Sequence, residues 1–278
     1  LPRGTPRGSA SRGRHLVPRL SLYRASRLAT FRRRVMPEGA PMPLLSLIPS
    51  PAAAPESSLS YMIGAVAEAM TSRAAWLADG DGLVEAGAFM EAAGETAPEG
   101  GPVVVTGTAF GLVHLLDRMR AEGRSVRLPG RSRIMETGGF KGRSREVSRA
   151  SLRAAMEELL GVPPEFVVNE YGMTELLSQL YAPVLEEGAG AAGRHVPPPW
   201  LRVRALDPVT LEPLPPGTPG LLCFHDLANL GSVSVVLTED VGTAGPDGVR
   251  LRGRTAGAEP RGCSLAVEEL LTARERTP

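Results

Sequence analysis

The chain has 278 residues, 42% of them hydrophobic, and a formal net charge of +1 at pH 7. This length can bury a sizeable core, and the balanced charge gives no reason to propose a nucleic-acid partner. No run of 18 or more apolar residues occurs, which excludes a conventional transmembrane helix.

The two cysteines, Cys223 and Cys263, form no Cys-x-x-Cys motif. Neither a disulfide framework nor a zinc site is indicated, so we expect a reduced, cytoplasmic protein. Cys223 and His225 would share one face of a strand, but two candidate ligands do not make a zinc site.

Residues 1–34 contain ten arginines and no acidic residue, and they lack the apolar core of a signal peptide. Two interpretations fit residues 1–20. They form either a disordered or truncated basic leader, which the composition favours, or a nucleic-acid arm or transit-like segment. Apolar residues at helical spacing then predict a helix over 21–34.

Strands and helices are expected to alternate through the next hundred residues. A strand is predicted over 44–48, followed by a helix that begins at Ser57 or Ser58, and a short helix lies within 80–101. Val103–Val105 is predicted to be a strand that Thr106–Thr108 breaks before a helix running to Gly123. Those three residues fit either a glycine turn with a threonine cap or a ligand-binding loop.

His114 sits beside the apolar face of that last helix, and we expect it to be an interior residue rather than a catalytic base. Strands are predicted over 125–128 and 133–135, and a helix from Ser148 to a stop at Gly161. The alternation predicts an α/β fold with a mostly parallel sheet and flanking helices.

A short polar run, Tyr171-Gly172-Met173-Thr174-Glu175, follows the buried run Phe166–Val168. We expect the strand to end here and a helix to begin with Thr174 as its N-cap. Gly172 allows close approach of the backbone to a ligand, Thr174 offers a hydroxyl, and Glu175 a carboxylate, which suits a nucleotide phosphate with Mg²⁺. The alternative is a capped helix whose first-turn carboxylate complements the helix dipole.

The character changes after Pro197–Pro199, where strands are predicted over 201–206, 221–224 and 233–237 and a hairpin turn over 245–248. Asp240 follows the last of these strands. Its carboxylate fits either a ribose site or an acidic turn. We therefore expect a basic leader over 1–20, an α/β core over 21–199, a smaller β-rich subdomain over 200–253 and a short C-terminal segment over 254–278.

Several of these motifs occur in an order that resembles a known superfamily. Tyr171 to Glu175 is similar to the fifth core motif of the acyl-adenylate-forming enzymes. The runs 134–146 and 168–175 resemble the acyl-protein synthetase family of bacterial luminescence systems. Leu237–Asp240 and Gly253–Arg254 fall where the superfamily keeps its ribose-binding aspartate and arginine.

The resemblance implies an adenylate-forming α/β core and a set of site residues. Thr174 would contact phosphate and Glu175 would bind Mg²⁺, while Asp240 and Arg254 would hold ribose. Tyr171 and Gly172 would contact the nucleotide, and Thr106–Thr108 would line the acyl side of the site. The residues expected around adenine are Thr137, Gly138, Gly139 and Phe140, and Lys141 beside them fits either a phosphate ligand or a solvated loop charge.

The implied activity is ATP-dependent conversion of a carboxylic acid, with a fatty acid expected, to acyl-AMP and then to a thioester. Cys263 would carry the acyl group on its thiol before transfer to a fatty-acid or acyl-CoA reductase subunit, or it is a small buried hydrophobe. An acyl-CoA ligase of the phenylacetate–CoA ligase type and a non-catalytic nucleotide-binding subunit are the alternatives.

The sequence departs from the superfamily at three places. The glycine-rich phosphate loop has only a poor counterpart in residues 8–13, no lysine follows Lys141, and Thr255–Gly257 stands where a hinge aspartate is usual. Either an N-terminal part of the family is missing or the protein has lost the phosphate loop, and a full C-terminal domain is not expected. Both explanations of the loop predict a low rate of turnover.

Overall fold

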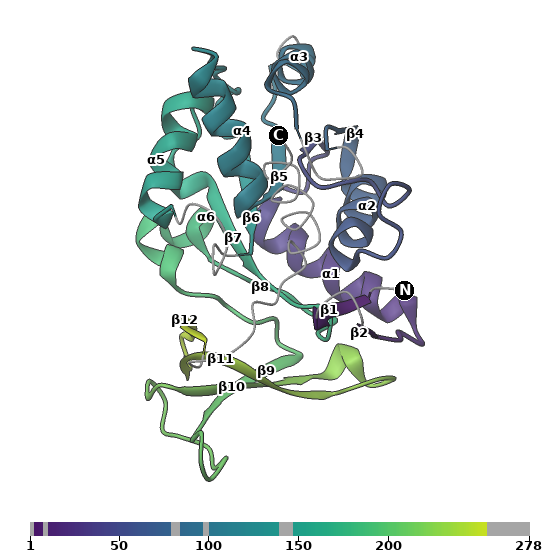
Figure 1. Ribbon diagram of the computed structural model, residues 1–278, viewed down its shortest axis with the longest axis vertical. Helices are drawn as coiled ribbons and strands as arrows, with labels where there is room; N and C mark the ends of the chain where they lie inside the picture. The colour runs from purple at the N-terminus through teal and green to yellow at the C-terminus, as the bar shows by residue number, and fades with distance from the viewer. Residues whose placement is uncertain (1–2, 8–10, 79–83, 97–99, 139–146, 255–278) are drawn as a thin grey trace.

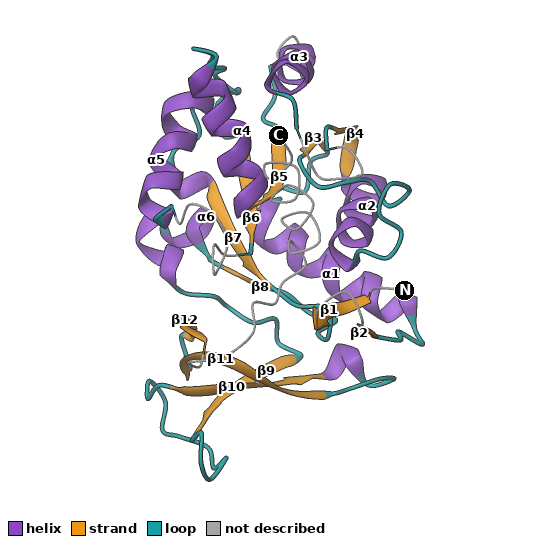
Figure 2. Ribbon diagram, viewed as in Figure 1, coloured by secondary structure: helices purple, strands orange, loops and turns teal. Residues whose placement is uncertain are grey.

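Two β-sheets organise the described part of the chain (Figure 1). The computed structural model describes residues 3–7, 11–78, 84–96, 100–138 and 147–254, and the side chains from His15 onward. The larger sheet lies between two groups of helices, and the smaller sheet lies at one end of this α/β layer structure (Figure 2). This arrangement confirms the predicted fold class.

The larger sheet has the strand order β4-β3-β5-β6-β7-β8. The first five strands pair in parallel, and β8 runs antiparallel to β7. Its strands are β3 (Met42–Ser46), β4 (Thr71–Trp76), β5 (Val104–Thr108), β6 (Arg133–Thr137), β7 (Val167–Tyr171) and β8 (Leu180–Tyr181). β3, β5 and β6 are buried along their whole length, and β6 buries Arg133 and Glu136 as well as apolar side chains.

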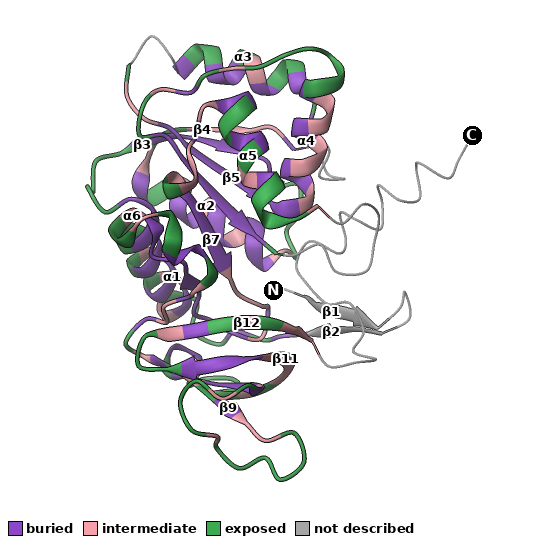
Figure 3. Ribbon diagram, turned by 90° about the vertical axis from the view of Figure 1, so that its left-hand side faces the viewer, coloured by how far each residue is buried: buried purple, intermediate pink, exposed green. Residues whose placement is uncertain are grey.

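Helices cover both faces of this sheet, and side chains alternate between the two faces along each strand. Val105, Ile134 and Val167 pack on one face beneath α3 (Ala86–Thr96), α4 (Ala109–Ala121) and α5 (Arg149–Leu160). Val104, Met135 and Val168 pack on the other beneath α1 (Leu20–Val35) and α2 (Ser58–Met70). The central strands are accordingly buried throughout in Figure 3.

Local capping chemistry fixes the ends of several helices. Ser57, Thr108 and Ser148 each accept the backbone N–H three residues later, and Gly161 ends α5 in the left-handed conformation with φ 69°. The predicted caps at Ser57 and Ser148 and the stop at Gly161 are thus confirmed. None of the helices in the residues described here is long and apolar enough to cross a membrane.

The smaller sheet is antiparallel with the order β12-β11-β10-β9. Its strands are β9 (Leu201–Leu206), β10 (Gly220–Asp226), β11 (Val235–Gly245) and β12 (Gly248–Arg254). Leu222, Phe224 and Val249 on its inner face pack against Leu176 and Leu180 of the α/β layer. Its turn between Gly245 and Gly248 confirms the predicted hairpin.

Further short elements complete the described chain. They are β1 (Arg3–Arg7) and β2 (Ser11–Arg14), which pair antiparallel, α6 (Val184–Glu187), and the 3₁₀ turns η2 (Pro164–Phe166), η3 (Ala189–Gly193) and η4 (Leu227–Asn229). β1 and β2 lie in the segment for which the composition favoured disorder.

One strand was missed, and three predictions about this part of the chain were wrong. β4 was missed because Thr-Ser-Arg-Ala-Ala-Trp carries little apolar signal, and its pairing with β3 supplies the order. Residues 125–128 are not a strand, although Val126 and Leu128 donate to the carbonyls of Leu159 and Leu160. Thr106–Thr108 continue β5 rather than break it. His114 is half-buried and stacks on Phe110 instead of lying in the interior.

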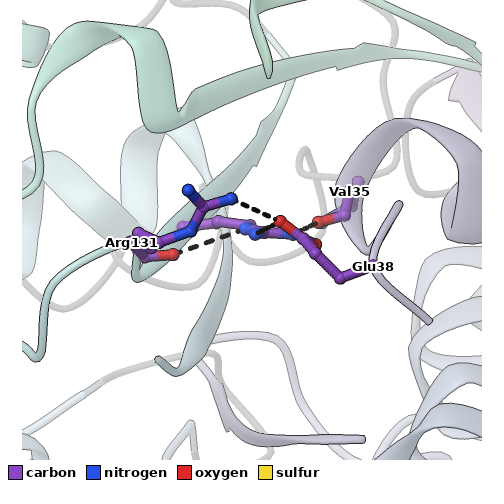
Figure 4. Close-up of polar contacts among 4 residues, drawn as sticks. Val35, Glu38 and Arg131 are labelled. Carbon is purple, nitrogen blue, oxygen red and sulfur yellow. Dashed lines mark hydrogen bonds and ion pairs between the residues drawn. The ribbon is translucent and has the colours of Figure 1, made fainter. Parts of the chain in front are cut away.

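Two polar networks tie α1 to distant parts of the chain. The hydroxyls of Ser26 and Ser178 lie 3.1 Å apart, and the Trp200 indole donates to both. At the other end, buried Arg133 donates to the Val35 carbonyl and to both carboxylate oxygens of Glu38, which also pairs with Arg131 (Figure 4). The Arg133 guanidinium lowers the pKa of Glu38 to about 2.

Candidate functional site

The carboxyl ends of β6 and β7 lie side by side and carry the first predicted site residues. In the parallel register Thr137 is the partner of Glu170, and Tyr171 ends β7. Side chains at this edge of a parallel α/β sheet are placed to meet a ligand that lies across the strand ends. The structure therefore brings Thr137 and Tyr171 to one edge, as the sequence predicted.

The segment after β7 is a loop and not a helix, which corrects the prediction that Thr174 caps one. Leu176 N–H donates to the Met173 carbonyl in a single turn, and the chain returns as β8. The buried Asp226 carboxylate accepts the Leu177 N–H at 2.9 Å and the Ser178 hydroxyl at 2.7 Å. These bonds hold Leu177 and Ser178 in a bend that leads into β8, so the loop lacks the N–H array and dipole of a helix start.

Gly172 is required in this loop by the carboxylate beside it. A Cβ built on Gly172 would lie 2.5 Å from Glu170 Oε1 and 3.4 Å from Gln179 Cγ. Glu170 is buried, and its other carboxylate oxygen accepts the Thr137 hydroxyl. Burial raises the pKa of Glu170 to about 7, against the opposing effects of Thr137 and Arg27.

Three predicted nucleotide-binding residues meet where the two sheets face each other. The Tyr171 hydroxyl donates to Asp240 Oδ2 at 2.7 Å, and Arg254 Nε lies 3.2 Å from Asp240 Oδ1. Asp240 and Arg254 are cross-strand partners in β11 and β12. Asp240 thus lies within a strand, which corrects the prediction that it follows one, because β11 continues to Gly245.

Two ring side chains, Phe224 and His195, pack against the Tyr171 ring. It stacks on Phe224 of the smaller sheet with ring centroids 5.8 Å apart, and it meets His195 edge-on at 6.1 Å. Burial and the Asp240 carboxylate raise the pKa of Tyr171 well above its ordinary value, so the hydroxyl remains a donor at neutral pH.

Thr174 and Glu175 lie on the same loop but differ in exposure, since Thr174 is buried and Glu175 is half-buried. The Glu175 carbonyl accepts the Asn229 side-chain amide at 2.8 Å. Burial lowers the pKa of His15, and the Glu175 carboxylate opposes this effect, so the segment before α1 reaches this loop. Gly138 is described, with φ 86°, whereas Gly139, Phe140, Lys141 and Cys263 lie outside the described residues.

A buried polar chain lies on the face of β7 that carries Tyr171, opposite the face of Glu170. Asn169 Nδ2 donates to Glu136 Oε1 at 3.2 Å, and Asn169 Oδ1 lies 2.7 Å from His195 Nε2. Burial, with the charges of Arg149 and Arg153, lowers the pKa of His195 to about 3. His195 is therefore neutral and donates through Nε2.

Comparison with known protein families shows to which family the chain belongs. The family model for acyl-protein synthetase, LuxE, matches residues 59–272. The chain belongs to the acyl-protein synthetase, LuxE family. Two long-chain-fatty-acid–luciferin-component ligases are similar over shorter stretches. The protein from Vibrio harveyi is 32% identical over 84 residues, which cover 28% of this chain and 22% of the relative, and that from Aliivibrio fischeri is 43% identical over 49 residues, 18% and 13%.

Two solved structures that share this fold are each about twice as long as the part of them that matches. ATP-bound MatB from Rhodopseudomonas palustris superposes with a TM-score of 0.63 at 15% identity, covering 91% of this chain and 47% of that one. A long-chain-fatty-acid–CoA ligase from Archaeoglobus fulgidus gives 0.65 at 12% identity, covering 98% and 53%. The LuxE-family chain therefore spans about half the length of these structures and shares their fold.

The sequence did not single out three residues that shape the LuxE-family site. Asp226 ends β10 and fixes the loop after β7. Asn169 of β7 hydrogen-bonds His195, which anchors the strand to the segment before the smaller sheet. Within the described residues, no group of three or more His, Cys, Asp or Glu side chains is placed to hold a metal ion. The residues that donate to Asp226 lie 48 and 49 positions earlier in the sequence, so no local pattern predicts these bonds. The one signal in the sequence is that Asp226 is a polar residue soon after the apolar run Leu221–Phe224.

Proposed function

We propose that this chain carries the nucleotide site of a ligase that activates a carboxylic acid with ATP, forming acyl-AMP and pyrophosphate. The observation that supports this most directly is the junction of Tyr171, Asp240 and Arg254 beside the loop of Thr174 and Glu175. Tyr171 and Asp240, 69 residues apart in the sequence, meet there, next to the carboxyl edge where α/β sheets bind nucleotides. Membership of the LuxE family supports the same reaction class.

The proposed roles follow from the chemistry of each group. The Asp240 carboxylate accepts the two ribose hydroxyls, and Arg254 pairs with it. Tyr171 and Gly172 contact the nucleotide, and the Thr174 hydroxyl contacts its phosphate. The residues from Thr137 to Phe140 surround adenine. The half-buried Glu175 carboxylate suits Mg²⁺, an ion that takes one or two protein carboxylates and completes its shell with substrate phosphates and water.

The acid and the acceptor are proposed from the family. The two curated relatives are named as ligases of long-chain fatty acids, so a fatty acid is the first substrate to test. Cys263 is proposed to carry the acyl group as a thioester, because a thiolate is a strong nucleophile and a thioester stays activated for the next transfer. A cytoplasmic reductase subunit is the proposed recipient.

The nucleotide site is tested by titrating ATP with Mg²⁺ calorimetrically into the parent chain and three variants. We expect Asp240→Asn and Glu175→Gln to bind ATP about 10-fold or more weakly, since each removes a charged contact. Asp247→Asn, on the exposed β11–β12 turn, is the matched control and should bind as the parent does. Equal affinity in all four proteins would refute the site assignment.

Acyl transfer is tested with labelled fatty acid and ATP. Hydroxylamine-labile label should appear on the parent and on Cys223→Ser but not on Cys263→Ser. Pyrophosphate release without label on either cysteine would refute the acyl-carrier role and favour coenzyme A as the acceptor.

A further inference from the structure

His195 connects β12 to β7, although it lies outside the strands of both sheets. Its backbone N–H donates to the Val249 carbonyl of β12 at 2.8 Å, and its carbonyl accepts the Val249 N–H at the same distance. Its imidazole Nε2 lies 2.7 Å from Asn169 Oδ1 of β7. The residue is 1% exposed. One buried residue therefore joins the edge strand of the smaller sheet to the strand that carries Tyr171.

β12 approaches the backbone of His195 closely. A Cβ built on Gly248 would lie 2.5 Å from the His195 carbonyl oxygen and 3.5 Å from Arg194 Cγ, and Gly248 has φ 124°. Glycine tolerates both this φ and so short an approach, because it has no Cβ. We therefore expect a displacement of His195 to displace the start of β12 as well.

These contacts form a second connection between the residues of the proposed ribose site. Asn169 and Tyr171 are two residues apart in β7, so their side chains share a face of the sheet. The Tyr171 hydroxyl donates to Asp240, and Arg254 at the end of β12 pairs with Asp240. Tyr171 and Asp240 are thus joined by their own hydrogen bond and, separately, through His195 and β12.

The groups around His195 set the direction of its hydrogen bond to Asn169. Asn169 Nδ2 donates to Glu136 Oε1 at 3.2 Å, so Asn169 Oδ1 is left to accept. Burial, with the charges of Arg149 and Arg153, lowers the pKa of His195 to about 3, so the ring is neutral and carries its proton on Nε2. A side chain without a donor at this position would leave Asn169 Oδ1 buried and unpaired.

We propose that His195 is a positioning residue of the nucleotide site, which holds Asp240 and Arg254 at the distance from Tyr171 that ribose recognition needs. The connection rests on the contacts above, and the identity of the ligand rests on the proposed function. His195 acts through these residues and touches neither nucleotide nor acid. Its effect should appear in the recognition of the two ribose hydroxyls, whose hydrogen bonds Asp240 is proposed to accept.

The test compares ATP with 2′,3′-dideoxy-ATP, each with Mg²⁺, in calorimetric titrations of the full chain. The parent should bind ATP about 10- to 100-fold more tightly, the range for hydrogen bonds to a charged group. His195→Leu removes the Nε2 donor and should reduce this preference to about 3-fold or less. His195→Gln can place an amide N–H near the position of Nε2 and should restore most of the preference.

The ratio of the two affinities separates positioning from stability. A variant that is partly unfolded binds both nucleotides more weakly by the same factor, so the ratio does not change. His114→Leu is the matched control, because His114 is half-buried on α4 and stacks on Phe110. Its nucleotide preference should equal that of the parent. Asn169→Ala cuts the connection at its other end and should also lose the preference, so it serves if His195→Leu does not fold.

Three results would overturn the proposal. They are an unchanged preference in His195→Leu (or in Asn169→Ala, if His195→Leu does not fold), a lost preference that His195→Gln does not restore, and an equal loss in His114→Leu. The first would mean that His195 only packs against the Tyr171 ring.

Failure of the proposed function gives a different result. A parent that binds neither nucleotide, or that binds both equally, would refute the ribose site and with it the role of His195. A preference for ATP that is lost in Asp240→Asn but kept in His195→Leu would support the ribose site and refute the role of His195.

Discussion

Gly172 and Glu170 illustrate how closely single residues constrain the candidate site. The Glu170 carboxylate occupies the position into which any side chain on residue 172 would project. Thr137 fixes that carboxylate from the neighbouring strand. A glycine is therefore needed here for space, whatever its role in ligand binding.

Replacing Gly172 with alanine should lower the free energy of unfolding by about 1–3 kcal/mol, the usual cost of an overpacked site. The measurement is urea denaturation. Gly231→Ala is the matched control, because its Cβ would meet only Pro18, at 3.5 Å, and the change should stay within about 0.5 kcal/mol. Equal effects at both positions would show that the Glu170 carboxylate does not constrain residue 172.

Glu170 should also make stability depend on pH. Its pKa is raised from 4.5 to about 7 in the folded protein, so the folded state binds the proton more tightly than the unfolded chain does. The resulting stabilisation is fully present below pH 4.5 and is lost as pH rises through about 7, a change of up to about 3 kcal/mol.

Glu170→Gln removes this titration while keeping an acceptor for the Thr137 hydroxyl. We expect the variant to lose less stability than the parent between pH 5 and pH 8.5 in chemical denaturation. Parallel curves for the two proteins would show that Glu170 is not the titrating group.

At the scale of elements, the loop between β7 and β8 depends on the end of β10. Asp226 accepts the Leu177 N–H, the Ser178 hydroxyl and the Ala228 N–H, so one buried carboxylate orders two segments. Thr174 and Glu175 lie just before the ordered residues. The position of the proposed phosphate and metal ligands is therefore set from the other sheet.

Asp226→Asn replaces one accepting oxygen with a donor and should cost about 1–3 kcal/mol of stability. It should also weaken ATP binding, although Asp226 contacts no proposed ligand group. Thermal unfolding and calorimetry with ATP measure the two effects, and Asp247→Asn again serves as the exposed control. Full ATP affinity in Asp226→Asn would mean that the loop is ordered without it.

The same comparison shows which elements a sequence can predict. The caps at Ser57 and Ser148 and the stop at Gly161 are local, because the bonds that define them span only a few residues. The helix expected at Thr174 did not form, since Leu177 and Ser178 donate to the distant Asp226 carboxylate and no local signal encodes these bonds. β4 was missed for a related reason, as pairing with β3 rather than apolar composition makes it a strand.

The candidate site also has features that the sequence predicted and features that it did not. Tyr171, Asp240 and Arg254 were chosen by resemblance, and the structure brings them together. Their binding roles remain predictions. Asp240 was expected after a strand because Val233–Leu237 is apolar and Thr238–Asp240 is not, yet the cross-strand pairing with Arg254 extends β11 through it.

At the scale of the whole molecule, a hydrogen bond between Tyr171 and Asp240 joins the two sheets beside their shared apolar contact. Tyr171 belongs to the larger sheet and Asp240 to the smaller one, and Phe224 packs against the Tyr171 ring. This junction lies beneath the proposed nucleotide. Ligand binding there should therefore stabilise the docking of one sheet on the other.

A double-mutant cycle of Tyr171→Phe and Asp240→Asn measures this junction. We expect a coupling free energy of about 1.5–3 kcal/mol in urea denaturation, the range for a hydrogen bond to a charged group. The pair Tyr61→Phe and Asp247→Asn, two residues without a described contact to each other, should show no coupling. Additive effects at Tyr171 and Asp240 would show that the bond contributes nothing to docking.

The attachment of α1 has a consequence for synthesis of the chain. Ser26 hydrogen-bonds Ser178 and Trp200, which lie 152 and 174 residues later in the sequence and are therefore synthesised later. At a ribosomal rate of about 5–20 residues per second, that interval is roughly 8–35 s. Phe31 and Val35 can pack against Met42 and Leu44 as soon as those residues are made, so the polar anchor of α1 at Ser26 is among the last of its contacts to become available.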